Sequence, residues 1–438
     1  MSHLLWGNAD CVELAHRFGT PLYVMDESLI RARCWEIRSA FLEKWPRTAA
    51  CYASKAFLTK TMARIICQEG LGLDVVSSGE LHTALSAGFP PSRIELHGNA
   101  KSEEELRRAI SAGVGRIVAD SVMELEILAA LAAQEGRRVP ISIRVAPGVT
   151  PRTHAHIVTG HRGSKFGLPI EDEFLTPAVK FALASPYLDL KGFHFHIGSQ
   201  IFENSFHVET VRRAAALLEN LKTRLGFEAE ELNLGGGFGV GKLPDVPAPG
   251  EFEEPREPHV PLGLFTDAMM ESLTEECARR HLTRPSVVIE PGRWVVAEAG
   301  ITLYSVETVK RLPGVIYAGV DGGMPDNPRP ALYQAVYEGV LANKIDALPA
   351  EKVTIAGKCC ETGDILIESI ALPPVERGDI VAVFNTGAYN FSMASNYNRL
   401  PRPAVVLVKD GIPDVIVARQ TYDDLLRGDT IPARMTRT

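Results

Sequence analysis

Apolar residues along the first two thirds of the chain follow two alternating patterns. Short, β-type apolar runs alternate with longer stretches in which apolar residues recur at helical spacing, such as 102–113, 121–135 and 262–281. We predict strands at eight of the apolar runs: 49–53, 72–77, 93–97, 116–119, 140–146, 191–197, 231–235 and 286–290. Eight strands, each but the last followed by a helix-sized segment, are typical of a closed parallel barrel. The pattern therefore predicts an α/β fold built on a (β/α)8 TIM-like barrel.

The pattern changes after about residue 298. Short strand-like runs separated by Gly, Pro and Asp, with little helical periodicity, then follow: 301–309, 316–321, 353–356, 365–370, 379–385 and 403–417. Near the N-terminus, Pro21-Leu22-Tyr23-Val24 also has the pattern of a strand. We therefore assign residues 27–298 to the barrel, and residues 1–26 with 299–438 to a mostly β domain.

Residues 240–261 form an irregular stretch between the seventh and eighth predicted strands. They include six prolines and several acidic residues. Proline removes a backbone donor and disrupts both helices and central strands. We expect a surface loop or lid there.

Composition and charge narrow the classes of function. Apolar residues make up 45% and charged residues 23% of the 438 positions, as in ordinary globular enzymes. The net charge is −8 and no block of basic residues occurs, so we expect neither nucleic acid nor a membrane as a partner. No run approaches the roughly 18 apolar residues of a spanning helix, and no signal-peptide pattern is visible. Seven scattered cysteines without a CxxC pair indicate reduced thiols and a cytoplasmic location.

Three consecutive glycines, Gly235-Gly236-Gly237, end the predicted seventh strand. Barrel enzymes carry their chemistry at the carboxyl ends of the strands and commonly bind phosphate after strands seven and eight. Glycines let backbone N–H groups close on an anion without intervening side chains, so we expect a phosphate site. Two alternatives remain. Gly236-x4-Gly241-Lys242 matches the first part of an NTPase phosphate loop, although Leu243 replaces its Ser/Thr, and a glycine turn can also have no ligand.

A lysine and a glutamate close two other predicted strands. Lys55 ends the first strand, where its amine suits a Schiff base with pyridoxal phosphate (PLP), the alternative being a solvated surface charge. Glu290 ends the eighth strand. A carboxylate facing the pyridine nitrogen of PLP keeps that nitrogen protonated and strengthens the electron sink. The alternative for Glu290 is a structural ion pair with Arg293.

Two histidines and a thiol complete the candidates. His194 and His196 end the sixth strand and share a face, because they are two residues apart. Such a pair can ligate zinc, as in a metal-dependent barrel hydrolase, but no further ligands are obvious, and stacking on a planar cofactor explains His196 without a metal. In the β domain, Cys360 beside Glu361 is either an inert buried thiol or a proton donor.

Together these motifs resemble the alanine-racemase-like PLP decarboxylases, and most closely the diaminopimelate decarboxylase family. The likeness extends from Phe18-Gly19-Thr20-Pro21-Leu22-Tyr23 to Asn398-Arg399-Leu400-Pro401-Arg402-Pro403. Between these ends lie further matching motifs: Tyr52-Ala53-Ser54-Lys55, Leu73-Asp74-Val75-Val76-Ser77, Ser164-Lys165-Phe166-Gly167, His194-Phe195-His196-Ile197-Gly198-Ser199-Gln200, Glu290-Pro291-Gly292-Arg293, Arg329-Pro330-Ala331-Leu332-Tyr333, Cys360-Glu361 and Ser395-Asn396-Tyr397-Asn398. Ordered motifs over most of the chain make the resemblance specific.

The resemblance implies PLP as cofactor and a head-to-tail homodimer with two shared active sites. It implies that Lys55 holds PLP, that His196 stacks on its ring and that Glu290 binds its ring nitrogen. Asp74 and Arg144 are expected behind the Schiff base. The other implied cofactor contacts are Ser199, Gly235, Gly236, Gly237, Gly292, Arg293 and Tyr389.

The implied substrate contacts carry both signs of charge. Arg293 and Arg329, with Tyr333 and Tyr389, suit a distal carboxylate, in part through bidentate arginine pairing. Glu361, expected with Cys360 from the partner subunit, suits a distal ammonium. One end with both groups describes meso-2,6-diaminopimelate, so we expect its decarboxylation to L-lysine and CO₂. Cys360 is the first candidate proton donor and Lys55 the second.

Four departures from the family pattern leave related activities open. Lys358 stands where a proline is usual, Asn390 and Ser78 replace glycines, and Ala146 replaces an asparagine. The alternatives are a decarboxylase of ornithine, lysine, arginine, carboxynorspermidine or a specialised metabolite, and a racemase of the same fold, which Glu290 disfavours. From other classes, a metal-dependent hydrolase and a non-catalytic PLP carrier remain.

Overall fold

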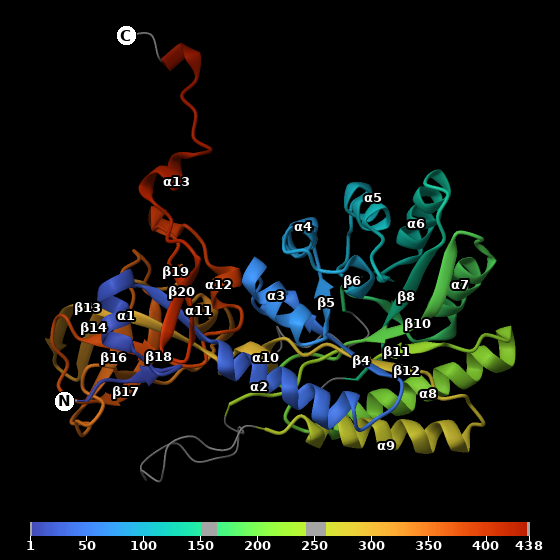
Figure 1. The fold of residues 1–438 in the computed structure, drawn as a ribbon, viewed down its shortest axis with the longest axis horizontal. Coiled ribbons are helices and arrows are strands. Elements are labelled where there is room, and N and C mark those ends of the chain that lie inside the picture. The colour runs from blue at the N-terminus through green and yellow to red at the C-terminus, as the bar shows by residue number, and fades with distance from the viewer. Residues whose placement is uncertain (1, 150–163, 242–259, 436–438) are drawn as a thin grey trace. The chain divides into compact units, whose positions relative to one another are not determined.

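The computed structural model describes most of the chain: residues 2–149, 164–241 and 260–435. The chain divides into two compact units, shown in Figure 1. One unit comprises residues 31–296, and the other combines residues 1–30 with 297–438. Most of the loop expected at 240–261 lies outside the described residues, which omit 242–259.

Eight parallel strands close into a barrel in the first unit. In chain order they are β4 (Thr48–Ala53), β5 (Gly72–Val75), β6 (Ile94–Leu96), β7 (Arg116–Ala119), β8 (Val139–Ala146), β10 (Leu188–Phe195), β11 (Glu231–Asn233) and β12 (Ser286–Ile289). Each strand pairs with the next, and β12 pairs with β4, so the ring has no open edge. The short strand β9 (Leu168–Pro169) pairs with the end of β8. The predicted barrel is confirmed.

Helices connect the strands and surround them (Figure 1). Ser77, Ser102 and Ser121 each accept a backbone N–H at the start of a helix, which satisfies a donor that the first turn leaves unpaired. The helices of this part of the chain are α2 (Glu27–Ile37), α3 (Lys60–Gln68), α4 (Ser78–Ser86), α5 (Glu103–Ala112), α6 (Val122–Gln134), α7 (Asp172–Ala184), α8 (Ser205–Leu225), α9 (Gly263–Arg279) and α10 (Arg293–Val296). Among the described residues, no helix is both long and apolar enough to cross a membrane.

The interior of the barrel is polar near the carboxyl ends of the strands. Along and just after β6, Ile94 and Leu96 alternate with Glu95 and His97, and all four are buried. Successive side chains of a strand point to opposite faces. Asn233 on β11 hydrogen-bonds to Glu95, although β11 and β6 are not neighbours in the ring. The polar face of the strand therefore points inward, and the apolar face points toward the helices.

A mixed sheet with the path β17-β16-β14-β13-β3-β19-β20 builds the second unit. Its strands are β3 (Leu22–Asp26), β13 (Gly300–Leu312), β14 (Val315–Val320), β15 (Gly339–Leu341), β16 (Glu351–Ala356), β17 (Ile365–Leu372), β18 (Ile380–Val383), β19 (Ala404–Lys409) and β20 (Ile412–Val417). Ile301 and Leu303 pack into one hydrophobic cluster, and Tyr304 and Val306 pack into another. Both faces of β13 are thus buried at these positions.

The N-terminal segment joins this sheet as expected from its sequence. Strand β3 lies between β13, to which it is antiparallel, and β19, to which it is parallel. Helix α1 (Cys11–Phe18) packs its apolar residues into the same hydrophobic cluster as β3. The remaining helices of the unit are α11 (Arg329–Tyr333), α12 (Asn390–Met393) and α13 (Tyr422–Leu426). The mostly β domain with its N-terminal contribution is confirmed.

Barrel closure requires a glycine at position 192. A Cβ there would lie 1.8 Å from the carbonyl oxygen of Glu231 on the paired strand β11. We expect Gly192→Ala to lower the free energy of unfolding by about 3 kcal/mol, because the strands must separate to admit the methyl group. Urea unfolding followed by circular dichroism measures the change. Gly79→Ala is the control, because a Cβ at this helical position meets only Ser77 Oγ at 3.7 Å; equal stability of both variants would contradict the prediction.

Candidate active site

Lysine and aspartate from adjacent strands meet at the carboxyl-terminal mouth of the barrel. Lys55 lies two residues after the end of β4, in the turn Ser54–Ala56, and Asp74 lies on β5. Lys55 Nζ donates to Asp74 Oδ2 at 3.2 Å. The Asp74 side chain is fully buried, whereas that of Lys55 is 38% exposed. A buried carboxylate thus holds an amine that still reaches solvent, at the end of the barrel where enzymes of this fold carry their chemistry.

Both carboxylate oxygens of Glu290 have partners inside the barrel. His97 Nε2 lies 2.9 Å from Oε1, and Asn233 Nδ2 donates to the same oxygen at 2.7 Å. His194 Nε2 lies 3.0 Å from Oε2. Asn233 Nδ2 also lies 3.0 Å from Glu95 Oε2, and His97 Nε2 lies 3.4 Å from it. We call these five buried side chains the Glu290 network.

The two histidines of the Glu290 network differ in charge. Burial alone would lower the pKa of His97, but the charges of Asp74 and Glu290 and the hydrogen bonds to Glu290 and Glu95 raise it to about 10. Burial lowers the pKa of His194 to about 4 in spite of Glu290. Burial would raise the pKa of Glu290, yet His97 and His194 hold it well below its usual value. At neutral pH, a cationic His97 and a neutral His194 therefore flank an anionic Glu290.

The three glycines pack against two neighbouring strand ends. A Cβ on Gly236 would lie 2.2 Å from the carbonyl oxygen of Glu290, and one on Gly237 would lie 2.2 Å from that of Gly198. Gly235 and Gly237 have φ angles of +68° and +91°, which glycine adopts without strain. The turn therefore excludes side chains, and the backbone N–H of Gly235 donates to Asn233 Oδ1 at 2.9 Å. Lys242 and Leu243, which bear on the nucleotide-phosphate alternative, lie outside the described residues.

His196 contacts the glycine turn. Its Nδ1 accepts the backbone N–H of Gly236 at 3.3 Å. Burial, followed by the positive charges of Lys55 and Arg144, lowers the pKa of His196 well below its usual value. The imidazole is therefore neutral at physiological pH, with its proton on Nε2.

Two arginines flank these groups. Arg293 begins α10, and its Nε donates to Ser199 Oγ at 3.3 Å. Arg144 lies beside His194 in the β8–β10 pairing, with its guanidinium 4.6 Å from the ring centre of Phe166. Among the described residues, Arg293 is not a partner of Glu290, so the alternative ion pair between them is not formed.

His194 and His196, considered above as a possible zinc site, have separate partners in the structure. The described groups that approach metal-ligand geometry are instead His97, His194 and Glu290, whose ligand atoms lie within 4.8 Å of one another. In the structure, His97 and His194 each lie within hydrogen-bonding distance of Glu290. These three groups belong to the Glu290 network.

His97, Glu95 and Asn233 were not among the sequence candidates. Glu95 and His97 alternate with apolar residues in a short strand, and this alternation was the available signal. The same alternation of polar and apolar residues occurs in a strand that has one face in solvent. Only closure of the barrel places that polar face in the interior.

In the second unit, Arg329 packs between two aromatic rings. Its guanidinium carbon lies 4.8 Å from the ring centre of Tyr333 and 5.3 Å from that of Tyr389, and the residue is buried. Cys360 and Glu361 lie on an exposed turn elsewhere in the same unit. The structure thus groups three of the five expected substrate residues. Glu361 lies with the expected proton donor Cys360 on a separate turn, and Arg293 lies in the barrel unit.

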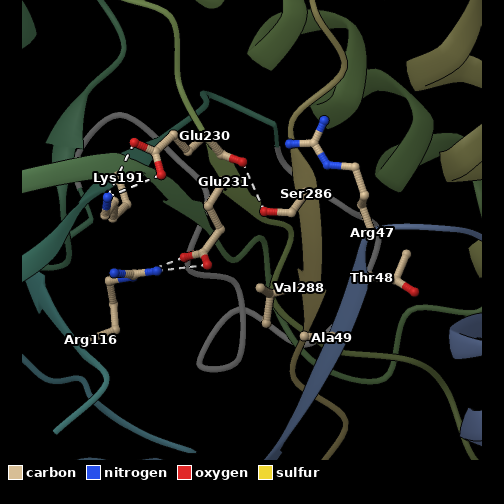
Figure 2. Close-up of a pocket in the computed structure, with 9 residues that line it drawn as sticks. All are labelled: Arg47, Thr48, Ala49, Arg116, Lys191, Glu230, Glu231, Ser286 and Val288. Atoms are coloured by element: carbon tan, nitrogen blue, oxygen red, sulfur yellow. Dashed lines mark hydrogen bonds and ion pairs between the residues drawn. The ribbon is translucent and has the colours of Figure 1, made fainter. Parts of the chain in front are cut away.

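The opposite mouth of the barrel holds a hollow with none of the predicted site residues. Four of its charged side chains are paired: Arg116 makes two hydrogen bonds to Glu231, at 3.0 and 2.8 Å, and Lys191 binds Glu230 at 3.0 Å (Figure 2). The lining residues are Arg47, Thr48, Ala49, Arg116, Lys191, Glu230, Glu231, Ser286 and Val288. This amino-terminal end of a barrel usually serves stability.

The charge of His97 predicts a pH-dependent stability. Its pKa rises from about 6.5 in the unfolded chain to about 10, so its contribution is complete below pH 6.5 and is lost as the pH approaches 10. Over that window we expect this contribution to fall by up to about 1.4 kcal/mol per pH unit. The midpoint of urea unfolding, measured from pH 6 to 9.5, should fall less steeply for His97→Gln than for the unmodified chain.

His194→Gln is the matched control for this measurement. His194 is neutral above about pH 5, because its pKa is about 4. The variant should be less stable, yet keep the slope of the unmodified chain between pH 7 and 9.5. A slope that His97→Gln leaves unchanged would show that His97 is uncharged in the folded protein.

Comparison with known proteins agrees with this geometry. The family model described as pyridoxal-dependent decarboxylase, pyridoxal binding domain, matches residues 28–297. The diaminopimelate decarboxylases of Bacillus subtilis and Halalkalibacterium halodurans are 44% and 45% identical to the chain, each over 98% of it and 95% of the relative. The crystal structure of diaminopimelate decarboxylase from M. jannaschii in complex with L-lysine superposes with a TM-score of 0.88 at 34% identity, covering 97% of this chain and 95% of that one. The chain belongs to the pyridoxal-dependent decarboxylases, in the group that contains the diaminopimelate decarboxylases.

Proposed function

We propose that this chain decarboxylates meso-2,6-diaminopimelate to L-lysine and CO₂, with PLP as its cofactor. The family supplies the reaction class, and the near full-length relatives are diaminopimelate decarboxylases. The observation that carries the proposal is the Lys55–Asp74 pair, at 3.2 Å, in the same barrel mouth as the glycine turn and Glu290.

The barrel mouth fits PLP in three respects. Lys55 offers an amine at the right end of the barrel, and the glycine turn, which carries no side chains, leaves room for a phosphate group. Glu290 retains an acceptor position, because an ionised carboxylate offers about four and the described partners use three. When bound, PLP supplies a positively charged ring that takes up the electron pair left by the departing CO₂.

We assign Lys55 as the residue that holds the cofactor covalently. Asp74 balances the charge of its amine while that amine is protonated, and keeps it at the mouth. Once released from the cofactor, the amine is a positioned acid or base. The residues that we propose to complete the cofactor site are Arg144, His196, Ser199, Gly235, Gly236, Gly237, Glu290, Gly292, Arg293 and Tyr389.

Glu290 has the chemistry to hold a proton on a ring nitrogen. His97 and His194 keep it anionic, so its free acceptor position attracts a protonated donor. An arginine at this place would leave a pyridine nitrogen neutral and weaken the electron sink. This difference favours decarboxylation over racemisation within the fold. The neutral, planar ring of His196 suits stacking on the cofactor without adding charge.

Substrate choice depends on groups that suit a zwitterionic distal end. Arg329, held between the rings of Tyr333 and Tyr389, has a fixed fork for a distal carboxylate, to which Arg293 also contributes. Glu361 suits the distal ammonium. Ornithine and lysine lack the distal carboxylate and would leave Arg329 without its anion. We propose that Cys360 gives the final proton and that Cys360 and Glu361 come from the second subunit of a homodimer.

Replacing Lys55 should abolish turnover. We expect Lys55→Ala to lower the rate of L-lysine formation from meso-diaminopimelate by at least about 1,000-fold, because the residue is both attachment point and acid or base. Borohydride should fix PLP to the unmodified chain at Lys55 and not to the variant, as mass spectrometry will show. Lys60→Ala removes an exposed lysine five positions later and should behave as the unmodified chain; a PLP adduct at another lysine would refute the assignment.

Replacing Arg329 should damage recognition more than folding. We expect Arg329→Ala to raise the KM for meso-diaminopimelate about 100-fold, the effect of losing a charged hydrogen-bonded pair. Arg329→Lys should recover only part, because an ammonium lacks the bidentate fork. Steady-state kinetics measure both, with the 80%-exposed Arg377 side chain as the control position for an alanine substitution. Unchanged KM in Arg329→Ala would remove the charge argument for the substrate.

A further inference from the structure

A buried carboxylate anchors the exposed turn that carries Cys360 and Glu361. Asp364 is 2% exposed. Its Oδ2 accepts the backbone N–H of Cys359 at 2.8 Å, and its Oδ1 accepts that of Met324 at 2.6 Å. One side chain thus ties the turn to a segment some 40 residues away in sequence.

Two glycines make room for this carboxylate. A Cβ on Gly357 would lie 2.2 Å from Asp364 Oδ2, and a Cβ on Gly323 would lie 2.4 Å from the same oxygen. Backbone hydrogen bonds complete the turn, from Gly357 N to Asp364 O at 2.8 Å and from Asp364 N to Glu361 O at 3.1 Å. The absence of side chains at both positions therefore leaves the space that the Asp364 carboxylate fills.

A second residue holds the turn from its outer side. Asn398 Oδ1 accepts the backbone N–H of Cys360 at 2.9 Å. Asn398 has a φ of +51°, a conformation that asparagine adopts more readily than most residues. Its neighbour Tyr397 donates its hydroxyl to Oε1 of the exposed Glu361.

The two adjacent thiols have different surroundings. Cys360 is exposed, whereas Cys359 is half-buried beside Asp364. Burial, together with the charge and hydrogen bond of Asp364, raises the pKa of the Cys359 thiol to about 12. The Cys359 thiol is therefore harder to ionise than an ordinary thiol, and its neighbour Cys360 faces solvent.

We infer that Asp364 and Asn398 are positioning residues that fix the turn so that Cys360 and Glu361, and not Cys359, face the substrate. The inference rests on the proposed function and deepens it. Neither positioning residue is assigned a contact with substrate or cofactor. They act by holding two consecutive backbone N–H groups, of Cys359 and Cys360, from opposite sides.

Asn398 gives the clearest test, because it is exposed and its replacement spares the core. In the PLP-loaded enzyme, Asn398→Gly keeps the left-handed backbone and removes the acceptor, whereas Asn398→Asp keeps an acceptor oxygen. We expect the glycine variant to lose about tenfold or more in kcat/KM for meso-diaminopimelate, and the aspartate variant to stay within about threefold of the unmodified enzyme. Equal losses in both variants, or no loss in the glycine variant, would overturn the role of Asn398.

Thiol alkylation tests Asp364 independently of turnover. Iodoacetamide should modify Cys360 well before Cys359 in the unmodified enzyme, as followed by mass spectrometry. In Asp364→Asn, the rate at Cys359 should rise at least about tenfold, because its thiol loses the neighbouring charge. An unchanged rate at Cys359 would overturn the role of Asp364. If Asp364→Asn does not fold, the Asn398 pair decides the inference.

The same experiments separate this inference from the proposed function. If the unmodified enzyme forms no L-lysine from meso-diaminopimelate, the function fails, while the alkylation pattern still reports on the turn. If the enzyme is active and Cys359→Ser retains full activity, Cys359 has no role in turnover. A large loss of activity in that variant would contradict the distinction between the two thiols.

Discussion

An ionised carboxylate inside a barrel is the constraint on which the active-site arrangement depends. Glu290 is 5% exposed, so the protein must replace the water that this carboxylate would otherwise bind. Two histidines and Asn233 do so, and one of the histidines must be a cation for the charge to balance. That cation, His97, in turn needs Asp74 and Glu95 near it. The polar interior is therefore one connected group, in which removing any member leaves another without a hydrogen-bond partner or a compensating charge.

The order of strands and helices was predictable from sequence because barrel strands are buried and short. Each predicted strand overlaps an observed one, and the deviations have local causes. The sixth strand was predicted to begin at 191 but β10 begins at Leu188, because Asp189 and Lys191 interrupt the apolar run. Those two residues pair with each other at the amino-terminal end of the barrel. Likewise β13 extends to Leu312 through exposed charged residues whose backbones still pair with β14.

The site was predictable only in part, for a physical reason. Residues at strand ends, such as Lys55 and Glu290, lie next to breaks in the apolar pattern. They can therefore be identified as candidates from the sequence. Glu95 and Asn233 lie within strands, where a polar residue usually faces solvent. Contacts made across the fold, such as that between Asn398 and Cys360, leave no trace in the local pattern, because 38 positions separate the two residues. Periodicity predicts which residues share a face of a helix or strand, but not which residues that face contacts in the fold.

The departures from the family pattern can be judged by the contacts that each residue makes. Asn390, in place of a glycine, is fully buried, and its Oδ1 accepts the hydroxyl of Tyr337 at 3.3 Å, so the added side chain has a partner. Lys358, in place of a proline, exposes its side chain, while its backbone N–H donates to Gly322 O at 2.9 Å. A proline has no N–H and could not make this bond. The substitution therefore adds an anchor to the turn that carries Cys360, and its charged end extends into solvent instead of entering the packed region around Asp364.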